Sequence, residues 1–420
     1  MTAPWSAAAE HAASEIPMPA DLEAAARKVE RRQGLEASLL ILPLIVLIAF
    51  AFLVPVGLLL FKSVDNPVIA DGLPQTLRQL DGWSSEDGPP AESAYAALKA
   101  DIEKAQGEGS LGTIGARLNQ DYPGARSLLQ TTARKLKTAT GGPAKDLFLA
   151  IDKRWGEPQV FAAIRNAGSR LTGNYYLNAL DLTRGVDGDI IAKPEGQRLH
   201  VNLFTRTMWV SALTAFVCFL LAYPIAYLLA HLPERRANLL MIIVLLPFWT
   251  SILVRITSWI ALLQKQGVVN DTLATLGVID EAGRLALMYN MTGTVVVGTH
   301  ILLPFFILPL YSVMKTVNPN LVRAATSLGA SPFTAFRRVY FPLTVPGIFA
   351  GSSLVFILCT GYFITPALVG GQNGQLISNI IAYHMQQSLN WGLAAALSTL
   401  LLVLIGIVYF IYTRIVRDGR

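Results

Sequence analysis

Between two long apolar segments, residues 319–349 read PNLVRAATSLGASPFTAFRRVYFPLTVPGIF, a stretch with basic residues but no acidic one. Gly329 allows the chain to turn, so the stretch predicts two short helices joined at this glycine. Phe333 and Phe336 lie three residues apart, which places two rings on one face of a helix. We expect these rings to fill an apolar groove on another protein.

The sequence around this stretch is that of an integral membrane protein. Hydrophobic residues make up 53% of the 420 residues and charged residues 15%, whereas a soluble domain carries about a quarter charged residues. A helix needs about 20 apolar residues to cross the hydrocarbon core. Six segments contain such a run, and they cover residues 37–61, 207–231, 237–263, 285–314, 347–368 and 393–412. The predicted fold is an all-α membrane protein with six transmembrane helices.

Basic residues predict the orientation of these helices. They cluster before the first segment, after the second, after the fourth and at the end of the chain, within residues 27–32, 233–236, 315–338 and 414–420. Short loops rich in Lys and Arg stay in the cytoplasm. We therefore expect both termini on the cytoplasmic side of a bacterial inner membrane. Because the basic residues form no patch, the high net charge does not indicate nucleic acid binding.

A long polar insert separates the first two predicted helices. The chain divides into a cytoplasmic segment, a first transmembrane helix, the insert and the transmembrane core, at residues 1–36, 37–63, 64–202 and 203–420. Charged residues concentrate in the insert, and long loops cross the membrane largely regardless of charge. We expect the insert to be a periplasmic domain.

The insert is predicted to be mainly helical. Ala94, Leu98, Ile102 and Ala105 recur at helical spacing, and similar runs cover residues 127–137 and 145–154. The aromatic residues available for a small core are Trp83, Trp155, Phe161, Tyr175 and Tyr176. The insert contains no phosphate loop, nucleophile motif or metal-ligand spacing, so a structural or docking domain is favoured over an enzyme. The two cysteines, Cys218 and Cys359, lie in apolar segments, where they are more typical of buried small side chains than of a metal site or disulfide.

The loop at residues 317–347 resembles the cytoplasmic EAA loop of ABC importer permeases. That pattern is Glu-Ala-Ala, three residues, Gly, nine residues, an aliphatic residue, any residue, an apolar residue and Pro. Here Ala324 and Ala325 are followed at the same spacing by Gly329, Val339 and Pro342. The resemblance implies the six-helix fold of type I importers and a cytoplasmic partner that hydrolyses ATP.

One position departs from the family pattern. Arg323 stands where the family typically has Glu, so an ion pair through that residue is not implied. A cation at this position suits an acidic groove on the partner instead.

Other segments resemble the spermidine/putrescine type of these permeases. They are residues 247–251 (PFWTS), residues 253–255 (LVR), Trp259, residues 363–366 (FITP) and residues 390–391 (NW). The resemblance implies a translocation pathway for a small organic cation. The implied partners are a second permease subunit, a dimeric ATP-binding subunit that docks on residues 317–347, and a periplasmic solute-binding protein. The chain has no Gly-x-x-x-x-Gly-Lys-Ser/Thr motif, so we expect it to be no enzyme and to bind no cofactor, with ATP and magnesium on the partner.

Six residues are candidates for the translocation pathway, and none is a predicted metal ligand: Trp249, Arg255, Trp259, His300, Tyr362 and Phe363. Arg255 is either an anchor near the outer interface or a gate. His300 is more typical of a neutral imidazole bonded to a neighbouring helix than of a proton or substrate site. No acidic residue lies within the predicted helices, so we expect substrate selectivity to reside in the solute-binding protein.

The first hypothesis is thus a permease subunit of an ATP-driven importer, with a polyamine as its substrate. The alternatives are an importer permease for another small solute, such as an opine or an amino-acid derivative, and a secondary transporter or channel that works alone. The last class favours intramembrane acidic residues and internal repeats, neither of which the sequence has. A membrane-anchored sensor is a third possibility, but it requires a cytoplasmic signalling domain.

Overall fold

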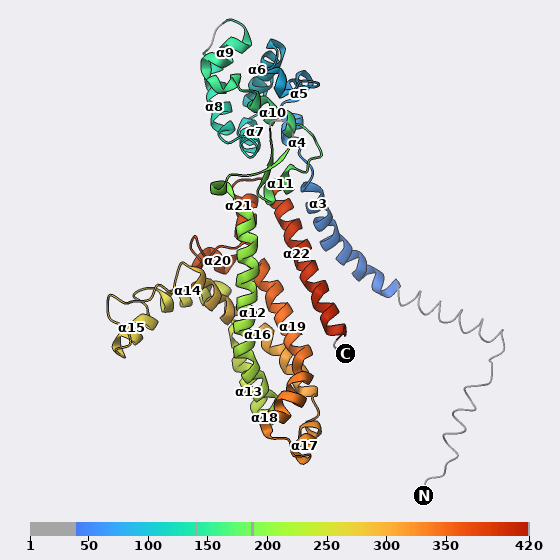
Figure 1. Cartoon of the computed structure of the whole chain (residues 1–420), viewed down its shortest axis with the longest axis vertical. Coiled ribbons are helices and arrows are strands. Elements are labelled where there is room, and N and C mark those ends of the chain that lie inside the picture. Colours follow the sequence, from blue (N-terminus) through green and yellow to red (C-terminus); the bar gives the residue numbers. More distant parts are fainter. Residues whose placement is uncertain (1–38, 139–140, 186–188, 419–420) are drawn as a thin grey trace, which may run out of the picture. The chain divides into compact units, whose positions relative to one another are not determined.

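The computed structural model describes residues 39–138, 141–185 and 189–418 (Figure 1). This part is almost entirely helical, and its only sheet is a hairpin of β1 (Leu182–Arg184) and β2 (Ile190–Ala192). The all-α prediction is confirmed. The predicted cytoplasmic segment, residues 1–36, lies outside the described residues. The chain divides after Phe61 into two compact units.

The first unit contributes one long apolar helix, Leu39–Lys62, whose last residue belongs to the second unit. It includes a π-helical turn, η1 (Ala49–Leu53), and continues as α3 (Val54–Lys62). Its most apolar 18-residue window has no buried residue. A helix that is apolar on all sides suits a membrane.

Four long helices form the centre of the second unit, and three of them pack side by side: α12 (His200–His231), α16 (Met291–Thr316) and α19 (Phe341–Gly361). The fourth is α22 (Trp391–Asp418). Gly351 lets α19 approach α16 closely, because a Cβ atom there would lie 2.8 Å from the ring of Phe306. Small residues at such crossings allow helices to pack tightly within a membrane.

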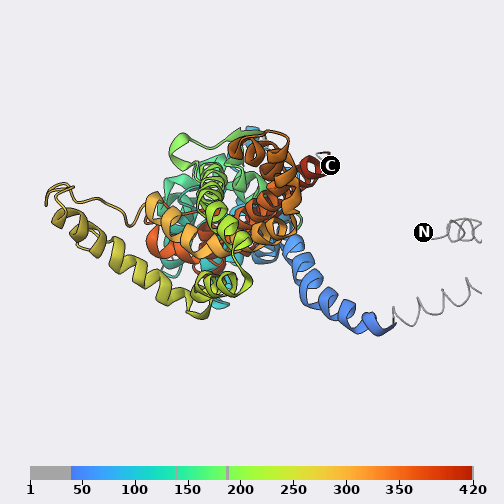
Figure 2. The ribbon, with the colours of Figure 1, turned by 90° about the horizontal axis from the view of Figure 1, so that it is seen from below.

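The predicted helix at residues 237–263 is wrong as one straight helix. Its sequence forms α13 (Glu234–Leu245), the 3-10 turn η5 (Leu246–Trp249) and α14 (Ile252–Leu263), followed by α15 (Val268–Thr275). The axis bends by 95° at the break. Pro247 has no N–H to donate, and Thr250 is extended, so the helical hydrogen bonds stop there. Figures 1 and 2 both show α14 and α15 extending away from α12.

The described residues therefore contain five apolar helices long enough to cross a membrane, or six if the bent pair is one span. The predicted helix at residues 347–368 also needs correction. The apolar helix begins earlier and ends at Gly361, since α18 (Pro332–Ala335) and the π-helical η6 (Phe336–Tyr340) run directly into α19. Residues beyond it form two separate short helices, α20 (Ile364–Val369) and α21 (Ile377–Gln386).

The insert is a bundle of short helices. They are α4 (Pro67–Gly72), α5 (Pro74–Gln79), η2 (Ser85–Asp87), α6 (Glu92–Gly107), α7 (Leu111–Leu118), α8 (Ala125–Leu136), α9 (Ala144–Ile151), η3 (Lys153–Gly156), α10 (Pro158–Ala167), α11 (Asn174–Ala179) and η4 (Glu195–Gln197). The four residues predicted to face inward from α6 are all buried. Proline at the first position of α4, α5 and α10 suits a helix start, where its missing N–H has no partner to lose.

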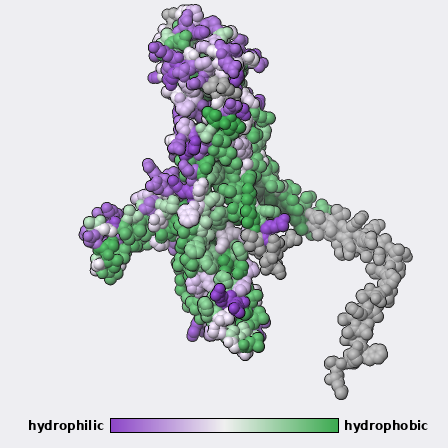
Figure 3. Space-filling view, in the orientation of Figure 1, coloured by the Kyte–Doolittle hydropathy of each residue, from purple (hydrophilic) through white to green (hydrophobic). Residues whose placement is uncertain are grey.

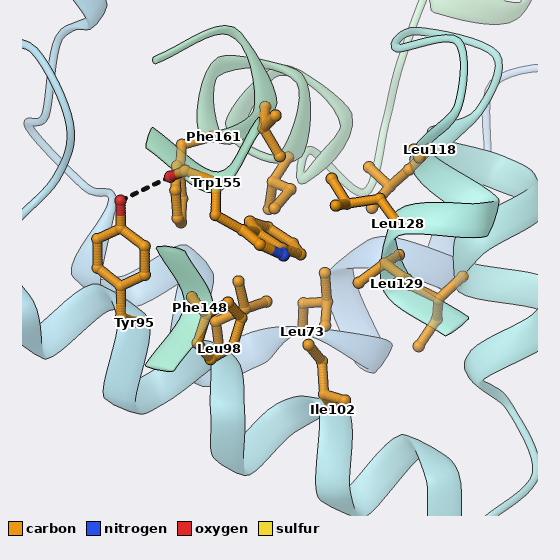
Figure 4. Close-up of a cluster of buried hydrophobic side chains, with 14 of the residues drawn as sticks. Leu73, Tyr95, Leu98, Ile102, Leu118, Leu128, Leu129, Phe148, Trp155 and Phe161 are labelled. Atoms are coloured by element: carbon orange, nitrogen blue, oxygen red, sulfur yellow. Dashed lines mark hydrogen bonds between the residues drawn. The ribbon is translucent and has the colours of Figure 1, made fainter. Parts of the chain in front are cut away.

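Aromatic rings fill the centre of the insert (Figure 4). Trp155, Phe148, Phe161 and Tyr95 are fully buried and meet edge to face or at a tilt. The Tyr95 hydroxyl donates to the Trp155 carbonyl at 2.7 Å, and the Trp155 indole N–H donates to the Thr132 hydroxyl at 2.8 Å. The insert therefore has a hydrophobic core of its own, in which the polar atoms of the Tyr95 and Trp155 side chains are paired.

Two of the aromatic residues predicted for this core lie elsewhere. Tyr175 and Tyr176, on α11, pack with Leu203 of α12 and Leu393 of α22. The ring of Tyr175 lies directly against Gly392, where no side chain would fit. Helix α11 thus attaches the insert to the transmembrane core instead of closing the insert's own core.

The start of α12 makes a second attachment. Asp181 accepts hydrogen bonds from the backbone N–H groups of His200 and Val201, at 3.2 and 2.8 Å, and lies 2.9 Å from the His200 ring. In Figure 3 the surface of the insert is mostly hydrophilic, whereas apolar residues cover the long helices of the core.

Candidate functional site

The 317–347 loop forms two short helices joined by a glycine turn, as its sequence predicts. Helix α17 (Pro319–Ser327) begins where Asn318 caps it, and it ends at Gly329, whose φ is +90°. The Gly329 N–H donates to the Thr326 carbonyl and the Ala330 N–H to the Ala325 carbonyl, both at 3.0 Å. This is the Schellman arrangement, which needs a left-handed residue at the position of Gly329.

The tip of this loop presents large apolar side chains to its surroundings. Leu328 is 88% exposed and Phe333 72% exposed, and no residue of α17 is buried. Ser331 caps the next helix, α18, by accepting a hydrogen bond from the Thr334 N–H. The described residues of the chain therefore leave two large apolar side chains exposed on either side of this turn, Leu328 before it and Phe333 after it.

Phe336 does not share this exposure. Its ring is partly buried and contacts the rings of Tyr223 and Tyr227 on α12 and stacks on Tyr340. The loop therefore does not present Phe333 and Phe336 as a pair, because η6 is already part of the long helix that packs on α12. Phe336 instead contacts α12 and belongs to the helix that continues into α19.

The remaining predicted loop residues have simpler surroundings. Ala325 and Val339 are partly buried, and Ala324 and Pro342 are exposed. Arg323 is exposed, and its side chain forms no ion pair within the described residues. Its carbonyl accepts from the Thr326 hydroxyl. The Arg323 guanidinium is thus available to an acceptor outside the chain.

The candidate pathway residues converge in part on a second place, between α14, α16 and the α19–α20 junction. The Trp259 indole N–H donates to Nδ1 of His300 at 3.0 Å. An indole is only a donor, so Nδ1 accepts and the proton of a neutral His300 is on Nε2. This is the inter-helix bond that the sequence favours for His300.

Arg255 and Tyr362 complete this outer polar cluster (Arg255, Trp259, His300, Tyr362). Arg255 lies close enough to act electrostatically on both His300 and Tyr362. Within the described residues, Arg255 Nε, the Tyr362 hydroxyl and the neighbouring Thr365 hydroxyl are buried without a hydrogen-bond partner. Buried polar atoms normally have one, so this cluster can still accept a ligand or water.

Two predicted pathway residues lie outside the cluster. Trp249 is 88% exposed at the break between α13 and α14, and Phe363 is 40% exposed. An exposed indole at a helix break is typical of a membrane–water interface or a contact with another chain. Two residues of these sites, Leu328 and Thr365, were not predicted from the sequence. Leu328 could have been predicted, since it is a large apolar residue next to the turn glycine, whereas nothing in the sequence distinguishes Thr365.

Comparison with known proteins places these features in a family. The family model described as binding-protein-dependent transport system inner membrane component matches residues 222–419. The spermidine/putrescine transport system permease protein PotB of Salmonella typhimurium is 36% identical over 219 residues, which are 52% of this chain and 76% of PotB. This chain belongs to the family of ABC importer permeases.

Two further permeases agree with this membership. PotB of Escherichia coli K12 is 35% identical over 52% of this chain and 79% of that protein. The inner membrane ABC transporter permease protein YdcU of Escherichia coli K12 is 33% identical over 50% of this chain and 69% of YdcU. A crystal structure of a bacterial ABC transporter that imports the polysaccharide alginate aligns with a TM-score of 0.45 at 18% identity, over 52% of this chain and 79% of that one. This chain is therefore a permease of an inner membrane transport system.

Proposed function

We propose that this permease subunit forms half of the pathway for ATP-driven import of a small organic cation, a polyamine. Two of the relatives, at 36% and 35% identity, carry spermidine and putrescine in their names. The 317–347 loop docks on a cytoplasmic ATP-hydrolysing subunit, and both termini lie on that side. A second permease subunit and a periplasmic solute-binding protein complete the assembly, and ATP and magnesium bind to the partner.

The observation that carries this proposal is the exposed apolar tip of the loop. Leu328 and Phe333 stand beside a glycine turn whose spacing matches the family pattern. Because the proposal places this loop in the cytoplasm, away from lipid, two large apolar side chains exposed at its tip favour a contact with another protein. Phe336 and Tyr340 continue from that tip into the core, so closure of the partner would move α12 and α19 together.

The outer polar cluster determines which groups of the pathway a passing cation can contact. These are the aromatic faces of Trp259 and Tyr362 and the neighbouring Thr365 hydroxyl, and the cluster contains no carboxylate. Aromatic faces attract an alkylammonium weakly, and Arg255 repels it. A weak site favours passage over retention, and selection then belongs to the solute-binding protein.

Arg255 also favours a second substrate class. Its buried Nε has no partner in the described residues, and a guanidinium pairs well with a carboxylate. An opine or an amino-acid derivative supplies that group. Uptake of radiolabelled spermidine into membrane vesicles of the native host separates the two, with and without an excess of unlabelled putrescine or octopine.

If the first proposal is correct, uptake needs ATP and putrescine competes with spermidine. The Arg255→Gln variant then keeps or raises the uptake rate, because it removes a repelling charge. If the substrate carries a carboxylate, spermidine does not accumulate, radiolabelled octopine does, and Arg255→Gln abolishes octopine uptake. Spermidine uptake that persists without ATP but collapses with the proton gradient would instead support a stand-alone secondary transporter.

A further inference from the structure

An open cleft of about 820 Å³ lies where the insert meets the transmembrane core. We call it the junction cleft. Residues of α4, α7, α8 and α11 form one wall, and α21 and the start of α22 form the other. In Figure 1, α21 and α22 lie below α4, α7 and α8. Its volume is within the range of about 300–1,000 Å³ that is typical of ligand pockets.

The lining of the junction cleft carries an excess of positive charge. Lys62, Arg117 and Arg126 line it together with Asp65 as the only carboxylate. Lys62 and Asp65 neutralise each other in an ion pair of 2.9 Å. The side chain of Arg126 has no ion pair within the described residues, so its charge faces the cleft unopposed.

Arg117 is the most unusual group in this wall, because it is only 4% exposed. Its Nη1 donates to Asp121 at 2.7 Å, its Nε donates to Asn66 at 3.0 Å, and its guanidinium lies over the ring of Tyr175 at 4.9 Å. Burial alone lowers the pKa of Arg117, but the Asp121 carboxylate outweighs this effect and the pKa is raised. The cation is therefore permanent.

One donor of this buried cation remains unused. Arg117 Nη2 has no hydrogen-bond partner within the described residues, and neither has Oε1 of Gln120, the next polar group along the same wall. Leaving a buried guanidinium N–H unpaired is unfavourable. An anionic acceptor in the cleft would satisfy Nη2, and a ligand hydroxyl would satisfy Gln120.

The position of the cleft indicates where such an anion comes from. Lys62 is the last residue of the first apolar helix and Trp391 is the first residue of the last one. Trp391 and Tyr383 both line the cleft and are about half exposed, and the apolar side chain of Leu389 between them in sequence is exposed too. Tryptophan and tyrosine at helix ends are typical of the membrane–water interface.

We propose that the junction cleft binds the phosphate headgroup of an anionic phospholipid from the leaflet beside the insert. Arg117 and Arg126 hold the phosphate, since guanidinium groups match its geometry. Gln120 accepts from a headgroup hydroxyl, and the acyl ester region lies along Leu389 and Trp391.

The test uses the full-length permease in detergent and measures binding of dioctanoyl phosphatidylglycerol, with dioctanoyl phosphatidylcholine and inorganic phosphate as parallel probes. The key variant is Arg126→Gln, whose side chain is at the rim and is not needed for the insert's core. Its matched control is Arg134→Gln, on the same helix α8, exposed and outside the cleft. A third variant, Trp391→Leu, tests whether the indole at the membrane–water interface contributes to lipid binding.

We expect phosphatidylglycerol to bind in preference to phosphatidylcholine, and Arg126→Gln to weaken that binding about fivefold. Arg134→Gln should leave it within twofold, and inorganic phosphate should not compete. Equal binding of both lipids, or equal losses in Arg126→Gln and Arg134→Gln, would overturn the proposal. Tight binding of inorganic phosphate that Trp391→Leu does not affect would assign the cleft to a free phosphate instead and refute the lipid.

Discussion

The insert and the 317–347 loop are both built from short helices, but they treat their large apolar side chains in opposite ways. In the insert, Trp155, Phe148 and Phe161 are fully buried. In the loop, Leu328 and Phe333 remain 88% and 72% exposed. Because burial of apolar side chains is the main force in folding, the insert can be stable by itself. In the loop, the favourable free energy of burying Leu328 and Phe333 is realised only when a partner covers them.

The largest effect that separates the two regions is expected from Trp155→Ala. This change leaves a cavity among Phe148, Phe161 and Tyr95 and removes the bond to Thr132. It should lower the free energy of unfolding of the insert by about 3–5 kcal/mol. Hydrogen exchange of the insert amides in the full-length protein measures this loss.

The control for that experiment is Leu171→Ala, which alters an exposed side chain of the same insert. We expect a change within about 0.5 kcal/mol. If both variants exchanged alike, the aromatic cluster would not be the core that stabilises the insert.

A smaller effect is expected where the insert joins the core, from Asp181→Ala. Asp181 accepts from the N–H groups of His200 and Val201 at the start of α12. Loss of such a cap costs about 1–2 kcal/mol, which should appear as faster hydrogen exchange in the first turn of α12. Asp181→Asn keeps an acceptor and a side chain that tolerates the positive φ of this residue, so it should restore much of the protection. No difference between the two variants would argue against the cap.

The same junction should depend on pH. Burial, and then the nearby His200, lower the pKa of His384 to about 4. In the unfolded chain the pKa is near 6.5, so the unfolded state binds more protons between these values. Stability of the junction is therefore present above pH 6.5 and falls as the pH drops towards 4.

The groups that face His384 include His200, which contacts Asp181, and Ser388, whose hydroxyl lies 2.8 Å from Nδ1. A His384→Gln variant should lose most of this pH dependence, as measured by hydrogen exchange of α21 between pH 4.5 and 7.5. The remainder belongs to His200, whose pKa burial also lowers. If the variant kept the full dependence, another group would be responsible for it.

The sequence was most informative where one local rule decided the structure. The helical spacing of Ala94, Leu98 and Ile102 correctly predicted a buried face, and Gly329 correctly predicted the turn, since each depends on residues close in sequence. The loop pattern and the relatives then agreed on the family.

Long-range packing decided the features that the sequence did not reveal. Nothing in the local sequence distinguishes Tyr175 from a residue of the insert's own core. Its ring packs against Gly392, far along the chain, where any side chain would clash with it. Phe336 matched Phe333 in spacing, yet the long helix that follows it turns it towards Tyr223 and Tyr227. Pro247 is compatible with a break in the helix, but the continuous apolar sequence on both sides of it favours one straight helix.

The smallest effect on folding, and the most direct test of the proposed coupling, comes from the double variant Leu328→Ser, Phe333→Ala. Because both side chains are exposed, the free energy of unfolding should change by less than about 0.5 kcal/mol for each. The measurement is substrate-stimulated ATP hydrolysis by the assembled transporter, purified from the native host through a tag on this permease. The control is Leu171→Ser in the insert. We predict that the double variant loses most of the stimulated hydrolysis while its amount in the membrane stays the same, and that the control keeps it. Unchanged stimulated hydrolysis in the double variant would contradict the account.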